Sequence, residues 1–169
     1  MQFVELAKKR YSVRSYKSGP VEKDKLQLVL EAARLAPTAA NRQAFRIIVI
    51  STQERGSELL RIYNKQWFVQ APMLICVCAV PDEAWIRRDG KNYCEVDAAI
   101  VMDHMVLAAT DLGLGTCWIA AFDAVAAREV LSIPQQITPI AFTPLGYPAD
   151  QPIEKKRKNL EELVKYNHW

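Results

Sequence analysis

The stretch Arg10-Tyr11-Ser12-Val13-Arg14 places two arginines and a hydroxyl at alternate positions. An amphipathic segment from residue 3 precedes it and predicts a helix that ends at Arg10. Alternate side chains of an extended backbone point to the same side, so Arg10, Ser12 and Arg14 should converge on one object. Two guanidinium groups and a hydroxyl suit a phosphate or a similar anion. A solvated basic loop is the alternative interpretation.

The same alternation recurs twice along the chain. Ala39, Asn41 and Gln43 alternate in a run of small and polar residues, and Lys155 and Arg157 alternate near the C-terminus. The run near the C-terminus is cationic, like the first stretch, whereas the middle run carries amides. A single ligand with a phosphate at one end and a hydrogen-bonding ring edge at the other would use all three.

The composition indicates one globular domain over residues 1–169, because half of the residues are hydrophobic. The net charge of +3, from 22 basic and 19 acidic residues, is too small to indicate a nucleic-acid partner. The most apolar stretches, 73–80 and 98–109, are too short or too often interrupted to span a bilayer. No signal-peptide pattern opens the sequence. We therefore expect no nucleic acid and no membrane among the partners.

The cysteines and histidines do not form a metal-binding pattern. The four cysteines lack the spacing of zinc ligands or of a disulfide framework, and two of them, Cys76 and Cys78, alternate within an apolar run. The two histidines, His104 and His168, are far apart and have no cysteine or acidic partner nearby in the sequence. We expect no metal site and a location in the reducing cytoplasm.

Hydrophobic periodicity and turn residues predict most of the secondary structure. Further helices are expected over 26–36, 57–71, 95–112 and 124–131, and a short closing turn or helix is expected over 160–164. Strands are expected over 45–51, 73–80, 116–121 and 137–145. Pro139 and Pro144 restrict the last strand to an edge or bulged position. The polar run 81–92, with its aromatic residues, is predicted to form a loop or lid.

The segment 95–112 is apolar over most of the circumference that a helix would present. Such a helix must be buried on nearly all sides. It is either the central helix of the core or a helix that a second subunit covers.

The run Gly113-Leu114-Gly115 resembles a dinucleotide-binding turn only superficially. The third glycine is missing, and the glycines follow a helix and precede a strand, which is the reverse of the required order. The run is better explained as the end of a helix and a turn into a strand.

Four blocks of residues resemble the signatures of the FMN-dependent nitroreductase family. They are Arg10-Tyr11-Ser12-Val13-Arg14, the run 36–43 (Ala-Pro-Thr-Ala-Ala-Asn-Arg-Gln), the run 112–119 (Leu-Gly-Leu-Gly-Thr-Cys-Trp-Ile), and Gly146-Tyr147-Pro148 followed by Lys155-x-Arg157. The blocks occur in the family's order and span almost the whole chain. The family's long insertion after the central helix is absent, so the chain resembles a minimal, short member.

This resemblance implies an α+β fold with a mixed central β-sheet flanked by helices. It also implies an intertwined homodimer with two FMN sites at the subunit interface and a C-terminal segment that adds to the partner's sheet. In such a dimer the apolar helix 95–112 would be an interface element.

The resemblance further implies which residues surround FMN. They are Arg10, Tyr11, Ser12, Arg14, Pro37, Thr38, Ala39, Asn41, Gln43, Asn64, Trp118, Ile119, Ala120, Ala121, Lys155 and Arg157. The cations and Ser12 would hold the phosphate, except that Arg14 would lie nearer the ribityl chain or the N1 and O2 side of the ring. Thr38 and Ala39 would line the ring from the other subunit, and the backbone at Ala120 and Ala121 would face N5 and O4.

The activity implied is reduction of a nitroaromatic, a quinone or a related acceptor by NAD(P)H, in a ping-pong cycle on FMN. Phe68, Trp85 and Trp118 are candidates for an aromatic wall above the ring, and ordinary packing is the alternative for each. Ala39 and Ala120 depart from the family's usual residues, which leaves the substrate preference open. Two other functions remain: a flavin dehydrogenase or oxidase without nicotinamide use, and a flavin-holding dimer without turnover.

Overall fold

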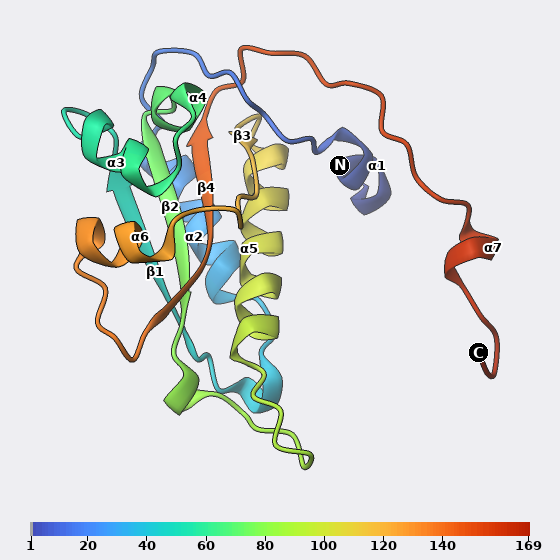
Figure 1. Cartoon of the computed structure of the whole chain (residues 1–169). Coiled ribbons are helices and arrows are strands. Elements are labelled where there is room, and N and C mark those ends of the chain that lie inside the picture. Colours follow the sequence, from blue (N-terminus) through green and yellow to red (C-terminus); the bar gives the residue numbers. More distant parts are fainter. Residues whose placement is uncertain (1) are drawn as a thin grey trace.

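The computed structural model describes residues 2–169, so Met1, the first residue of the expected domain, lies outside the described residues. A four-stranded sheet in the order β1-β2-β4-β3 forms the centre (Figure 1). Its strands are β1 (Phe45–Ser51), β2 (Met73–Ala79), β3 (Gly115–Thr116) and β4 (Thr138–Gly146). All neighbouring strands pair antiparallel. The α+β class is confirmed, but parallel pairing, expected in a mixed sheet, is limited among the described residues to an isolated bridge between Ser12 and Thr116.

Helices cover both faces of the sheet (Figure 1). The structure has α1 (Phe3–Lys9), α2 (Lys23–Arg34), α3 (Gly56–Ile62), α4 (Gln66–Gln70), α5 (Cys94–Asp111), α6 (Ala124–Leu131) and α7 (Leu160–Leu163), with short 3-10 helices at Ala39–Asn41 and Pro81–Glu83. Alternate residues of β2 pack in opposite directions: Ile75 and Val77 pack with α2 and α5, whereas Leu74 and Cys76 pack with α3, α4 and α6. Both sides of β2 are therefore buried, as its continuous apolar run predicts.

Two elements differ from the sequence predictions. The expected helix 57–71 is two helices, because Tyr63 adopts an extended conformation between α3 and α4. This break lets Leu59 and Phe68, on different helices, enter the same hydrophobic cluster. The expected strand 116–121 is regular only at its start, in β3, and beyond it Ile119 makes an isolated bridge to Phe142.

Strand β4 lies inside the sheet, although its two prolines predict an edge or bulged position. It pairs along its length with β2, whereas β3 reaches it only at Leu145 and Gly146. The side of β4 that faces β3 therefore needs few ladder hydrogen bonds. Pro139 lies at a register shift opposite Val77 and Cys78, which confirms the bulged alternative.

The turn after α5 brings the N-terminal stretch to the sheet. Gly113 has a φ of 77°, and Leu114 N donates to Ala109 O, so the helix ends in a left-handed cap. A Cβ on Gly115 would lie 2.7 Å from a methyl group of Val13, so only glycine permits this close approach. The interpretation of these glycines as a helix end and turn is confirmed.

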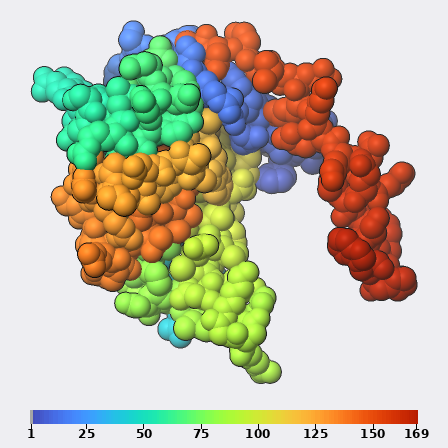
Figure 2. All heavy atoms as spheres, viewed as in Figure 1, coloured from blue at the N-terminus to red at the C-terminus, as the bar shows by residue number. Residues whose placement is uncertain are grey.

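The C-terminal residues leave the body of the molecule after β4 (Figure 2). The segment 151–159 has no regular structure, and α7 follows it. Within residues 2–169, none of the helices combines the length and the apolar character that crossing a membrane requires.

Candidate functional site

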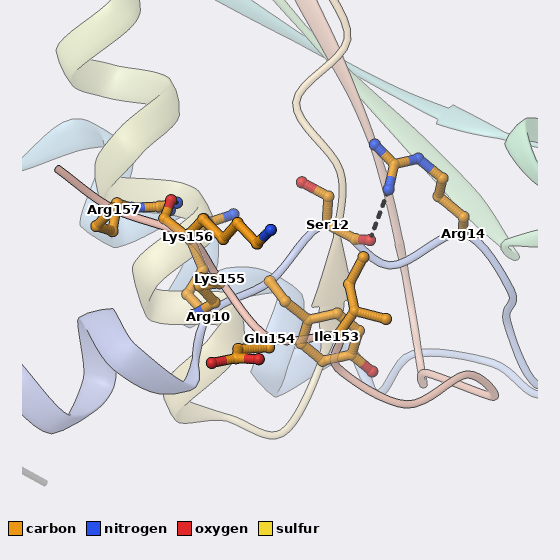
Figure 3. A pocket seen from close by; sticks show the side chains of 9 residues that line it. Arg10, Ser12, Arg14, Ile153, Glu154, Lys155, Lys156 and Arg157 are labelled. Atoms are coloured by element: carbon orange, nitrogen blue, oxygen red, sulfur yellow. Dashed lines mark hydrogen bonds between the residues drawn. The ribbon is translucent and has the colours of Figure 1, made fainter.

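Both ends of the chain line a cavity of about 280 Å³, which we call the cationic cavity (Figure 3). Its lining residues are Arg10, Tyr11, Ser12, Arg14, Ile153, Glu154, Lys155, Lys156 and Arg157. Lys156 was not among the residues singled out in the sequence, because strict alternation selects only Lys155 and Arg157 in this run. The residues 153–157 have no regular strand structure, so consecutive side chains can reach the cavity.

The sheet holds the stretch 10–14 in place. Val13 is buried, and its N–H donates to the carbonyl of Thr116 over 2.9 Å. Tyr16, also buried, donates its hydroxyl to the carbonyl of Val13 over 3.0 Å. Arg10, Ser12 and Arg14 consequently remain at the surface, on the opposite side from Val13, as the alternation predicts.

Asp150 joins the two ends of the chain. Its carboxylate accepts from Arg14 N at 2.7 Å and from the Tyr11 hydroxyl at 3.1 Å. Next to it, Ala149 N donates to Ser15 O at 2.8 Å. Burial and the Asp150 carboxylate raise the pKa of Tyr11 above its usual value, so this phenol remains a donor at neutral pH. The sequence contains no motif that marks Asp150 for this role.

Lys155 lies among other cations. Its ammonium donates to the carbonyl of Lys8, at the end of α1. Burial lowers the pKa of Lys155, and Arg10 and Arg157 lower it further through repulsion. Glu154 also lines the cavity, but no carboxylate in residues 2–169 forms an ion pair with Lys155. An anionic ligand would stabilise this group of unpaired cations.

Arg14 is separated from the other cations. Figure 3 shows it on the far side of Ser12 from Lys155 and Arg157, and its guanidinium donates to the Ser12 carbonyl at 3.4 Å. The guanidinium carbon also lies 6.0 Å from the centre of the Trp67 ring. Arg14 therefore faces a different part of any ligand than Arg10 does.

The segment after β3 continues from this region. Because Ser12 bridges to Thr116, the residues that follow Thr116 start beside the cationic cavity. Trp118 is 39% exposed, and Ala120 and Ala121 are also exposed, whereas Ile119 is buried. The small, exposed alanines leave the backbone open to a ligand.

The amide residues lie in a separate loop, 37–43, which we call the amide loop. Ala40, Asn41 and Gln43 have φ values of 50°, 54° and 52°, in the left-handed region. Thr38 Oγ1 accepts from Gln43 N at 3.0 Å and closes the loop. Such a conformation is costly for alanine and glutamine and persists only where other contacts impose it.

The amide loop and the cationic cavity lie at opposite ends of α5. Ala39 N donates to Asp97, in the first turn of α5, whereas Ser12 is beside Thr116, just after the last turn. A helix of 18 residues is about 27 Å long. Trp85 lies at the end of α5 that carries the amide loop, because its carbonyl accepts from Tyr93 N. One chain therefore does not bring these residues to a single site.

Two remaining predicted residues have distinct positions. Asn64 is exposed in the turn between α3 and α4, near Trp67 in sequence. Phe68 is fully buried and packs edge to face against Tyr63 and Phe142. This burial favours the alternative given for Phe68, ordinary packing in the core, over a place in a pocket wall.

A family model of the nitroreductase family matches residues 7–67 and 56–147 of the chain. A putative NADH dehydrogenase/NAD(P)H nitroreductase of Methanothermobacter thermautotrophicus is 31% identical over 90% of this chain and 80% of its own length. An FMN reductase [NAD(P)H] of Bacillus subtilis is also 31% identical, over 86% of this chain and 66% of its own length.

Solved structures show the same fold. A nitroreductase family protein from Clostridium difficile 630 superposes with a TM-score of 0.92, at 43% identity and with full coverage of both chains. An FMN-dependent nitroreductase from Clostridium difficile R20291 superposes with a TM-score of 0.79, at 28% identity over 99% of this chain and 100% of its own. The family model covers the first three blocks and the start of the fourth, and the superposition with the first of these structures covers all four. The chain belongs to the nitroreductase family.

Proposed function

We propose that this protein is an FMN-dependent oxidoreductase that uses NAD(P)H to reduce a nitroaromatic, a quinone or a related small acceptor. The observation that carries the proposal is the cationic cavity, which Arg10, Lys155 and Arg157 line together with the half-buried Ser12. Two relatives named for NAD(P)H support the electron donor, and two similar proteins named for FMN support the cofactor.

The residues present fit FMN. Arg10, Ser12, Lys155 and Arg157 match its phosphate in charge and hydrogen-bonding capacity. Arg14, displaced from this cluster, would stabilise negative charge at the N1 and O2 edge of the ring. When bound, FMN accepts hydride and passes electrons on, and the protein supplies the orientation and the electrostatics.

We also propose that the site is completed by a second copy of the chain in a homodimer. In one chain the amide loop and the cationic cavity are separated by the length of α5, and a single FMN cannot contact both. The residues after β4 support a homodimer, because Ile153, Leu160 and Trp169 are at least 76% exposed in one chain. Val96 and Ile100 likewise leave one side of α5 only partly covered.

Donor and acceptor would bind in turn at the same place. No glycine-rich phosphate turn in the described residues offers a second nucleotide site, since Gly113 and Gly115 serve a helix end. From the amide-loop end, Trp85 would approach the site of the other subunit. Its ring packs edge to face on Tyr93, at 5.2 Å between centroids.

The test is anaerobic mixing of the FMN-loaded protein with NADH or NADPH, followed by a nitroaromatic or quinone. We expect bleaching by a nicotinamide, reoxidation that the acceptor accelerates, and parallel double-reciprocal plots. Absence of bleaching by either nicotinamide would favour the dehydrogenase or oxidase alternative. Bleaching without acceptor-dependent reoxidation would favour a flavin-holding dimer, and intersecting plots would contradict the shared site.

Two broader expectations belong to the same proposal. We propose that residues 1–169 act as one FMN-binding domain. We place the protein in the cytoplasm because Cys76, Cys78, Cys94 and Cys117 are all free thiols. Mass measurement of the protein from cell fractions, with and without thiol alkylation, tests the location.

A further inference from the structure

We propose that Asp97 is a positioning residue that holds the amide loop in the conformation needed to contact FMN. This inference rests on the proposed function, because it assigns Asp97 a role in the same site. Asp97 does not itself touch the ligand. It acts through the backbone of Ala39.

The environment of Asp97 is unusual for a carboxylate. Its side chain is 1% exposed, and Oδ1 accepts a hydrogen bond from Ala39 N at 2.9 Å. Oδ2 is buried and has no hydrogen-bond partner within residues 2–169. Burying a carboxylate with so few partners opposes folding, so core stability alone does not explain an aspartate at this position.

The amide loop needs an external constraint. Ala40 and Gln43 have φ values of 50° and 52°, where a side chain with a Cβ is disfavoured. Within the loop, Thr38 Oγ1 fastens Gln43 N, and Asp97 fastens Ala39 N from outside. The bond to Asp97 ties the first residue of the short helix Ala39–Asn41 to α5, the rigid helix of the core.

Geometry links this bond to the ligand. Asn41 and Gln43 are the amides expected at the ring, and both lie within four residues of Ala39. A change in the backbone conformation at Ala39 therefore displaces the side chains of both Asn41 and Gln43. Because Asp97 already holds the loop in place, the loop loses less conformational entropy when FMN binds.

The experiment compares Asp97→Ala and Asp97→Asn in the full chain. Asparagine keeps an acceptor oxygen of the same reach, whereas alanine removes it. Glu95→Ala is the matched control, because Glu95 is an exposed carboxylate in the same helical turn. Amide hydrogen exchange of residues 39–43 is measured without FMN, and FMN affinity is measured by fluorescence titration.

We expect Asp97→Ala to raise exchange in residues 39–43 about tenfold or more and to weaken FMN binding by about tenfold, as the loss of a charge-assisted hydrogen bond implies. Asp97→Asn should remain within about threefold of the wild type in both measurements, and so should Glu95→Ala. This rescue by asparagine separates positioning from a general effect on packing.

A second variant, Ala39→Pro, tests the same hydrogen bond by changing its donor instead of its acceptor. Ala39→Pro removes the donor, and the extended backbone of Thr38 (φ −130°, ψ 155°) accepts a following proline. It should weaken FMN binding as Asp97→Ala does, and the double variant should be no weaker than either single one. If Asp97→Ala does not fold, Ala39→Pro and Asp97→Asn decide the matter.

Wild-type exchange and affinity in Asp97→Ala, or additive losses in the double variant, would overturn the proposal. Faster exchange with unchanged FMN affinity would also overturn it, because the loop would then be held but would not serve FMN. Failure of the wild-type protein to bind FMN would instead contradict the proposed function, and the exchange data would still report on the bond.

Discussion

The cationic cavity and the amide loop are both held by an aspartate, but in opposite environments. Asp150 is only partly buried and accepts from Tyr11 and Arg14 at the surface. Asp97 is buried and accepts from Ala39 alone among the described residues. The cationic cavity would therefore attract a ligand by electrostatic interactions that water and salt screen. The amide loop would instead position its amides through a fixed backbone conformation.

The largest effect is expected for Arg10→Ala, which should weaken binding of the FMN phosphate without affecting binding of the ring. Arg10→Ala should weaken FMN binding by about 10- to 100-fold, because it removes a charge-assisted contact of about 1.5–3 kcal/mol. Riboflavin, which lacks the phosphate, should bind as it does to the wild type. Fluorescence titration of both ligands measures this. Arg34→Ala, which removes an exposed arginine of α2, is the control. Equal losses for both ligands would show that Arg10 does not act on the phosphate.

A smaller effect is expected at Asp150. Asp150→Ala removes negative charge near the cations, which favours the phosphate by about 1 kcal/mol or less in water. It also removes the acceptor for Arg14 N, at a cost of about 1.5–3 kcal/mol. The second effect is larger, so FMN affinity should fall several-fold.

Two variants sharpen this result. Asp150→Asn keeps an acceptor for Arg14 N and should bind FMN at least as tightly as the wild type. Tyr11→Phe removes only the hydroxyl that donates to Asp150 and should have a lesser effect than Asp150→Ala. Tighter FMN binding in Asp150→Ala would show that the negative charge of Asp150 affects FMN affinity more than its hydrogen bond to Arg14 N does.

Salt should distinguish the two regions in the unmodified protein. Raising NaCl from about 0.05 to 0.5 M shortens the Debye length from about 14 to 4 Å. FMN affinity should fall several-fold, since the cations of the cavity are exposed or only partly buried, whereas riboflavin affinity should change little. Calorimetric titration at the two salt concentrations measures both. Equal salt dependence for the two ligands would break the distinction between the regions.

The smallest expected effect concerns pH. Burial, Arg10 and Arg157 lower the pKa of Lys155, so its ammonium loses its proton at a lower pH than a free lysine does. The phosphate is a dianion above about pH 6. FMN affinity should therefore fall as the pH rises through the lowered pKa of Lys155. In Lys155→Arg, which keeps its charge, the fall should move to higher pH. An identical pH profile in both proteins would exclude Lys155 as its cause.

Local patterns in the sequence predicted much of the fold. The bounds of β1 and α6 follow from runs of branched or amphipathic residues. The alternation around Val13 predicted which side chains of the stretch 10–14 reach the surface. The four motifs, taken together, predicted the family, and the family model and solved structures confirm it.

The contacts that hold the site could not be read from the sequence. Arg14 and Asp150 are 136 residues apart, and Ala39 and Asp97 are 58 apart. Periodicity reports on neighbours within a few residues, whereas these bonds depend on where the sheet and α5 place distant segments. The sequence left two alternatives for Phe68, a pocket wall or ordinary packing, for the same reason, since its burial follows from the break at Tyr63 and from packing on Phe142.

The sequence by itself determined the chemical groups of the site: cations in two runs, one of which also carries a hydroxyl, and amides in a third. Each is a property of residue type and local spacing. Only the tertiary structure decided that the two cationic runs share one cavity and that the amide loop lies at the other end of α5. The reason is that the direction of α5 is set by its packing against α2 and β2, which no local pattern encodes.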